Sequence, residues 1–77
     1  MKLIQILGAG CPKCEKLKKN AEEAVQLAGV EAQVEKITDI VKITSFGVMM
    51  TPALAIDGKV KAVGRVLSPE EIKKLLV

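Results

Sequence analysis

Residues 1–37 combine two short apolar runs with one long amphipathic segment between them, and this pattern points to a fold built around a parallel pair of strands. Lys2–Leu7 is apolar and stops at glycine, so it predicts a buried strand. From Cys14 onward apolar residues recur at helical spacing until Gly29, which is suited to cap a helix C-terminus. Val30–Ile37 alternates between apolar and polar residues and predicts a second strand. Together these segments predict a parallel βαβ unit.

The next part of the chain predicts a short helix and then a β-hairpin. The apolar positions of this helix are Ile40, Val41, Ile43 and Phe46. Gly47 would end it. Asp57-Gly58 is a two-residue hairpin signal, because the turn requires positive φ angles. It joins predicted strands at Ala53–Ile56 and Lys59–Val63.

The last segment predicts a third helix and completes the order βαβαββα. Ser68 and Glu71 form a capping box, with Pro69 at the first helical position. The inward-facing residues of this helix should be Ile72, Leu75 and Leu76. The predicted fold class is α/β, with a central four-stranded mixed sheet flanked by three helices.

Length and composition predict one compact domain over residues 1–77. The chain is 49% hydrophobic and 27% charged, which excludes disorder. Its single aromatic residue is Phe46, so the core must consist of Ile, Val, Leu and Ala. The net charge of +3 is spread along the chain, with acids beside most lysines. A nucleic-acid-binding surface is therefore not expected.

The N-terminal segment and the cysteine content predict a cytoplasmic protein. The apolar stretch after Met1-Lys2 is too short for a signal peptide, and no stretch approaches the length of a membrane span. In a reducing compartment, a two-cysteine motif is more often catalytic or metal-binding than a structural cross-link.

The two cysteines, Cys11 and Cys14, are the main candidates for covalent chemistry in a chain without histidine, tyrosine or tryptophan. Their spacing at a helix start puts them on one face, near the Cα separation of roughly 4.4–6.8 Å that a disulfide needs. Pro12 suits the first helical turn, and the helix N-terminus together with Lys13 would stabilise a thiolate. We expect Cys11, at the exposed end, to be the nucleophile. Cys14, nearer the apolar stripe, should be the resolving thiol.

The residues alone leave other uses of these thiols open. Two thiolates suffice for Cu(I), so a soft-metal binding or carrier module is the main alternative. A zinc site needs four ligands, which this chain could supply only by sharing cysteines in a dimer. A third possibility is a non-catalytic adaptor that uses the fold only for docking, but the presence of both motif cysteines argues against it. We expect no metal and no cofactor.

Three stretches resemble the small thioredoxin/glutaredoxin-like redox proteins of archaea and bacteria. They are Cys11–Cys14 (CPKC) at a strand-to-helix junction, Phe46–Leu54 (FGVMMTPAL) and Val63–Ser68 (VGRVLS). They follow the order of the family and span nearly the whole chain. The resemblance implies a minimal thioredoxin-like fold with a redox-active disulfide. It also implies a thiol–disulfide oxidoreductase that reduces protein disulfides, in electron transport and cell redox homeostasis.

The resemblance also implies supporting residues and partners. Beside Pro12 and Lys13, the Thr51–Pro52 bond should be cis and lie against the cysteines, and Gly64 should form the turn towards the last helix. The expected partners are protein substrates that contain disulfides and a thioredoxin-reductase-type or other electron donor. No nucleic-acid or membrane partner is expected, and the protein should be a monomer.

The chain departs from the family pattern near the motif. Gly10 replaces an aromatic residue before the first cysteine, and Gln5 replaces a buried acid of thioredoxins. Gly64-Arg65 stands where glutaredoxins have two glycines and an acid, so use of glutathione is not expected. Of Met49 and Met50, one should fill core space and the other should lie exposed beside the cysteines.

Overall fold

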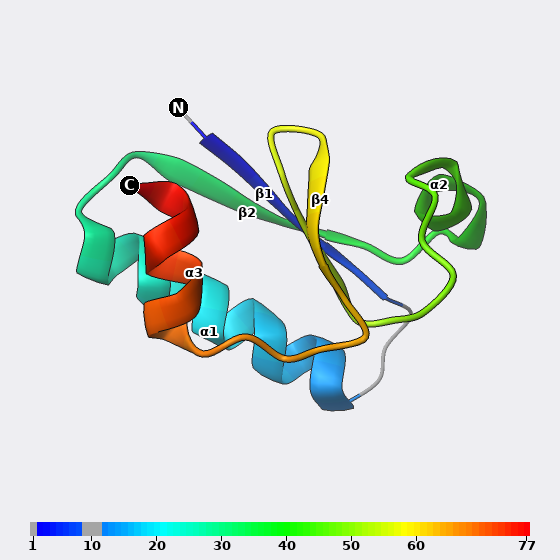
Figure 1. Ribbon diagram of the computed structural model, residues 1–77, viewed down its shortest axis with the longest axis horizontal. Coiled ribbons are helices and arrows are strands. Elements are labelled where there is room, and N and C mark those ends of the chain that lie inside the picture. Colours follow the sequence, from blue (N-terminus) through cyan, green and yellow to red (C-terminus); the bar gives the residue numbers. More distant parts are fainter. Residues whose placement is uncertain (1, 9–11) are drawn as a thin grey trace.

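The computed structural model describes residues 2–8 and 12–77, which form a four-stranded sheet flanked by three helices (Figure 1). The predicted order βαβαββα is confirmed. The elements are β1 (Lys2–Leu7), α1 (Pro12–Ala28), β2 (Ala32–Ile37), α2 (Ile40–Ser45), β3 (Ala53–Ile56), β4 (Lys59–Val63) and α3 (Pro69–Leu76).

The sheet is mixed, and its strands lie in the order β2-β1-β3-β4. β1 pairs in parallel with β2 and antiparallel with β3, and β3 pairs antiparallel with β4. β1 is thus an inner strand, which explains why its sequence is a nearly continuous apolar run. Its C-terminal end points towards the N-terminus of α1 (Figure 1).

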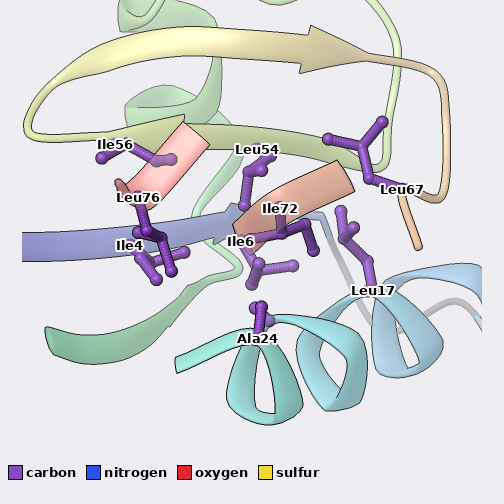
Figure 2. Packing of buried hydrophobic residues seen from close by; sticks show 10 residues of the cluster. Ile4, Ile6, Leu17, Ala24, Leu54, Ile56, Leu67, Ile72 and Leu76 are labelled. Atoms are coloured by element: carbon purple, nitrogen blue, oxygen red, sulfur yellow. The ribbon is translucent and has the colours of Figure 1, made fainter. Parts of the chain in front are cut away.

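The larger part of the core lies between one face of the sheet and the helices α1 and α3. Ile4 and Ile6 of β1 project towards Leu17 and Ala24 of α1 and Ile72 of α3, as Figure 2 shows. Of these side chains, none is exposed to solvent. Burial of an aliphatic side chain of this size stabilises a fold by roughly 1.5–3 kcal/mol. This packing fixes α1, and with it the first turn that carries Cys14, against the sheet.

A smaller apolar cluster lies on the opposite face of the sheet. Leu7 follows Ile6 in β1 and therefore points to the other side, because successive side chains of a strand alternate between faces. It packs with Ile43 of α2, and the other buried members of the cluster are Ile37, Val48 and Ala53. Both faces of the sheet at the C-terminal end of β1 are therefore covered.

The predicted turn residues adopt the expected backbone conformations. Gly29 has φ +64° at the end of α1, and Asp57 and Gly58 have φ angles of 51° and 83° in the hairpin turn. The capping box between Ser68 and Glu71 is present at α3. Asp57 also accepts a 2.9 Å hydrogen bond from the Leu3 amide, which ties the hairpin to β1.

Two local predictions are wrong. β2 begins at Ala32 rather than at Val30, because the chain leaves α1 through the left-handed Gly29 and needs two more residues to join the sheet. Leu75 is 37% exposed instead of facing inward. The buried stripe of α3 follows Ile72 and Leu76, which are one helical turn apart, and Leu75 lies at its edge.

No helix in residues 2–8 and 12–77 is long and apolar enough to cross a membrane.

Candidate active site

The candidate site forms where the end of β1, the first turn of α1 and the segment before β3 meet. Gly8 follows β1, and a Cβ atom added to it would lie 2.2 Å from the Sγ atom of Cys14. The same position is 3.7 Å from the Cβ atom of Thr51. Three segments that are far apart in the sequence thus converge at the Cys14 sulfur.

Cys14 is fully buried in the first turn of α1. Pro12 begins this helix and is exposed, as is Lys13. The burial of Cys14 follows from the helical spacing, because Leu17 and Ala21 continue the same buried stripe. Cys11 lies outside the described residues, so its role as the nucleophile stays a prediction.

The Thr51–Pro52 segment lies beside this cysteine. Its peptide bond is cis, the conformation that the sequence resemblance implied. Pro52 is buried and Thr51 is exposed. The carbonyl oxygen of Pro52 accepts a 2.8 Å hydrogen bond from the amide of Gly64, whose φ is +69°. The structure therefore brings Thr51 to Cys14 and joins Gly64 to the same segment.

Met49 and Met50 are both exposed, by 91% and 62%, so the prediction that one of them fills the core is wrong. The preceding residue, Val48, is 3% exposed and occupies the core position in this segment instead. Met50 packs against Gly64, since its Cε atom would lie 3.3 Å from a Cβ atom added there. Two thioether side chains therefore reach solvent directly before Thr51.

An ion pair links the first turn of α1 to the end of β2. The Nζ atom of Lys36 donates to the Oε1 atom of Glu15, the residue that follows Cys14. This hydrogen bond and the positive charge of Lys36 lower the pKa of the Glu15 carboxyl group. Sequence reasoning missed the pair, because the two residues are 21 positions apart and share no motif.

Gln5, at the position of the acid expected in thioredoxins, faces β2. Its Nε2 atom donates to the Oε1 atom of Glu35 at 3.4 Å. Glu35 is aligned with Gln5 in the parallel register of the two strands. A carboxylate is thus present in this part of the sheet, but it belongs to Glu35 on β2 and not to a residue of β1.

Residues with metal-ligating side chains do not cluster in the part of the chain that the structure describes. There, no three or more Cys, Asp or Glu residues come together in a way that could hold a metal ion.

Comparison with known proteins identifies the family. Residues 2–77 match the family described as "Thioredoxin domain". The chain belongs to the thioredoxin family. It is 50% identical over 76 residues to a thioredoxin of Methanothermobacter thermautotrophicus, with 99% of each chain covered. It is also 40% identical over 76 residues to a thioredoxin of Methanocaldococcus jannaschii, with 99% of this chain and 87% of that one covered.

The thioredoxin family assignment confirms two predictions. The four-stranded mixed sheet with three helices is a minimal thioredoxin-like fold. The full-length similarity to named thioredoxins shows that this chain is a thiol–disulfide oxidoreductase.

Proposed function

We propose that the protein reduces disulfides of protein substrates through a dithiol–disulfide cycle between Cys11 and Cys14. The Cys11 thiolate attacks one sulfur of the substrate disulfide, and the other substrate sulfur leaves as a thiolate. The Cys14 thiolate then attacks the Cys11 sulfur of the mixed disulfide and releases the second substrate thiolate. The substrate gains two electrons, and the protein is left with a Cys11–Cys14 disulfide.

The observation that carries this proposal is the convergence at the Cys14 sulfur. Cys14 is fully buried, so a bulky substrate cannot reach it directly, whereas a neighbour one helical turn away can. The exposed Thr51 lies next to it on the segment before β3. This arrangement suits a thiol that resolves a mixed disulfide rather than one that starts the reaction.

The exposed side chains beside the site suit an extended polypeptide substrate. Met49 and Met50 offer flexible, polarizable apolar surface that adapts to different partners. Thr51 precedes β3, so its backbone could pair with an incoming strand. We therefore propose that substrates dock across Met49, Met50 and Thr51 while their disulfide meets Cys11.

A reductase of the thioredoxin-reductase type is the proposed electron donor. It would return two electrons and two protons to the Cys11–Cys14 disulfide and so close the cycle. Glutathione is the second candidate donor, but Gly64-Arg65 lacks the second glycine and the acid that glutaredoxins have at this position. We propose that the protein acts as a monomer and that in a reducing compartment such as the cytoplasm the net direction is reduction of substrates.

The soft-metal alternative is not supported. The relatives that cover nearly the whole chain are named thioredoxins.

A disulfide-reduction assay tests the proposal. Insulin and dithiothreitol serve as substrate and reductant, and the wild-type protein should accelerate insulin reduction over the reductant alone. Cys11→Ser and Cys14→Ser should each return the rate to that background, because either change breaks the cycle. Glu22→Gln, an exposed change on α1, is the matched control and should keep the wild-type rate. Full activity in both serine variants would contradict the proposal.

A further inference from the structure

We propose that Gly8 is a positioning residue whose missing side chain sets the place of the Cys14 sulfur. This inference rests on the proposed cycle, in which Cys14 resolves the mixed disulfide. It adds a residue outside the CxxC motif to the determinants of that step.

The requirement for glycine at this position is one of space. A Cβ atom on Gly8 would lie 2.2 Å from the Sγ atom and 3.3 Å from the Cβ atom of Cys14. The first distance is far below van der Waals contact, which for carbon atoms is optimal near roughly 3.5–4.0 Å. The backbone conformation imposes no such requirement, because Gly8 is not among the glycines with positive φ. An alanine could adopt this backbone but could not fit against the sulfur.

The backbones on both sides of this contact are held in place. The amide of Gly8 donates a 3.0 Å hydrogen bond to the carbonyl oxygen of Ile37, which extends the pairing of β1 with β2. On the other side, the ion pair between Glu15 and Lys36 and the buried Leu17 hold the first turns of α1 on the sheet. The Cys14 side chain is therefore the part that would move, by rotation about its Cα–Cβ bond.

Rotation of Cys14 would affect one chemical step and spare the other. Resolution requires the Cys14 sulfur to approach the Cys11 sulfur along the geometry of a disulfide, with a Cβ separation of roughly 3.5–4.5 Å. Attack on the substrate uses only the Cys11 sulfur. A displacement of about 1 Å in a reacting group can cost about 100-fold in rate. Gly8→Ala should thus slow resolution by roughly 10- to 100-fold and leave attack within about two-fold of wild type.

A single-turnover reaction with a chromogenic aromatic disulfide separates the two steps. With reduced protein and reagent at equal, low concentrations, where exchange between two protein molecules is slow, attack by Cys11 releases the first coloured aromatic thiolate. Resolution by Cys14 releases the second. The wild-type protein should release two thiolates per reagent in two phases. Gly8→Ala should show a normal first phase and a slowed second phase. An unchanged second phase in the folded variant would overturn the inference.

Gly29→Ala is the matched control. It introduces the same methyl group at a glycine with nothing within 4 Å of the added Cβ atom, at the other end of α1. Its positive φ makes this substitution unfavourable for stability, so it reproduces a general loss of stability without contact with Cys14. Both of its phases should match wild type.

A double substitution decides the case in which Gly8→Ala folds poorly. Removal of the sulfur in Cys14→Ala should relieve the clash, so Gly8→Ala should lower the urea midpoint less in that background than in wild type. An equal loss in both backgrounds would show that the clash with sulfur is not the cause. Failure of the proposed cycle gives a different result. In that case Cys14→Ser would still release the second thiolate in the fast phase, whatever Gly8→Ala does.

Discussion

The amide of Gly64 donates a 2.8 Å hydrogen bond to the carbonyl oxygen of Pro52, so the residue after β4 is joined to the segment that lies against Cys14. Gly64 has φ +69°, and a Cβ atom there would lie 3.3 Å from the Cε atom of Met50. Backbone conformation and side-chain space both favour glycine at this position. The predicted Gly64 turn thus contacts the same segment as the candidate site.

Gly64→Ala should lower the free energy of unfolding by roughly 1–2 kcal/mol, the usual cost of left-handed backbone for a residue with a Cβ atom. Urea denaturation of the two proteins measures this difference. Gly64→Asn provides the comparison, because asparagine tolerates the left-handed region better than alanine. If alanine proved at least as stable as asparagine here, backbone conformation would not be the reason for this glycine.

Substrate docking should depend on Met49 and Met50. Replacement of both by serine should raise KM for a protein disulfide several-fold and leave kcat nearly unchanged, because in the proposed docking mode these side chains contact the substrate polypeptide and not the reacting sulfurs. Steady-state kinetics with insulin gives both constants. A small aromatic disulfide, which has no polypeptide to dock, should react at the wild-type rate. A selective loss of kcat would argue against docking.

The charge of Lys13 should raise the reduction potential. Lys13 is exposed in the first turn of α1, and in the sequence it follows the predicted nucleophile, Cys11, by two positions. Lys13→Glu should lower the potential by roughly 5–20 mV, because an exposed charge pair contributes about 0.2–1 kcal/mol and 30 mV corresponds to about 1.4 kcal/mol. Equilibration with a dithiothreitol buffer measures the shift. It should shrink at high salt, and a shift that is unaffected by salt would point to a structural cause.

The ion pair between Glu15 and Lys36 should contribute stability that depends on pH. The pKa of Glu15 is lowered in the folded protein, chiefly by the hydrogen bond from Lys36. The charged form is thus favoured by folding, and the contribution is present above the ordinary glutamate pKa of 4.5. It is lost as the pH falls through the lower pKa of the folded state.

Glu15→Gln tests this dependence. The variant should be less stable than wild type at neutral pH, and the difference should disappear in acid, where Glu15 is protonated in both states. Urea midpoints across this range provide the measurement. Glu22→Gln, exposed on the same helix, serves as the reference for the loss of one acidic side chain from α1. A difference that persists at low pH would exclude the ion pair as its origin.

Local sequence patterns predicted most of the fold, because its elements are defined by local chemistry. The stripe beginning at Cys14 defines α1, Asp57-Gly58 defines the hairpin, and the capping box at Ser68 defines the start of α3. The errors occurred where tertiary packing decides. Leu75 fits the helical pattern, but only Ile72 and Leu76 of α3 are buried in the core, and Leu75 is left partly exposed at its edge.

The site was predicted only in part, for the same reason. The motifs pointed to Cys14, Thr51, Pro52 and Gly64. No spacing could indicate that Gly8 touches the Cys14 sulfur or that Lys36 reaches Glu15, because these contacts depend on how β1, β2 and α1 pack. The exposure of both Met49 and Met50 likewise depends on Val48 filling the core.

The division of roles between the cysteines is tested most directly by trapping the mixed disulfide. Cys14→Ser, mixed with oxidised insulin, should accumulate a covalent adduct that mass spectrometry locates at Cys11, because the resolving thiol is absent. Cys11→Ser should accumulate little adduct, since the remaining thiol is fully buried. Equal trapping by the two variants, or an adduct found mainly at Cys14, would contradict the proposed cycle.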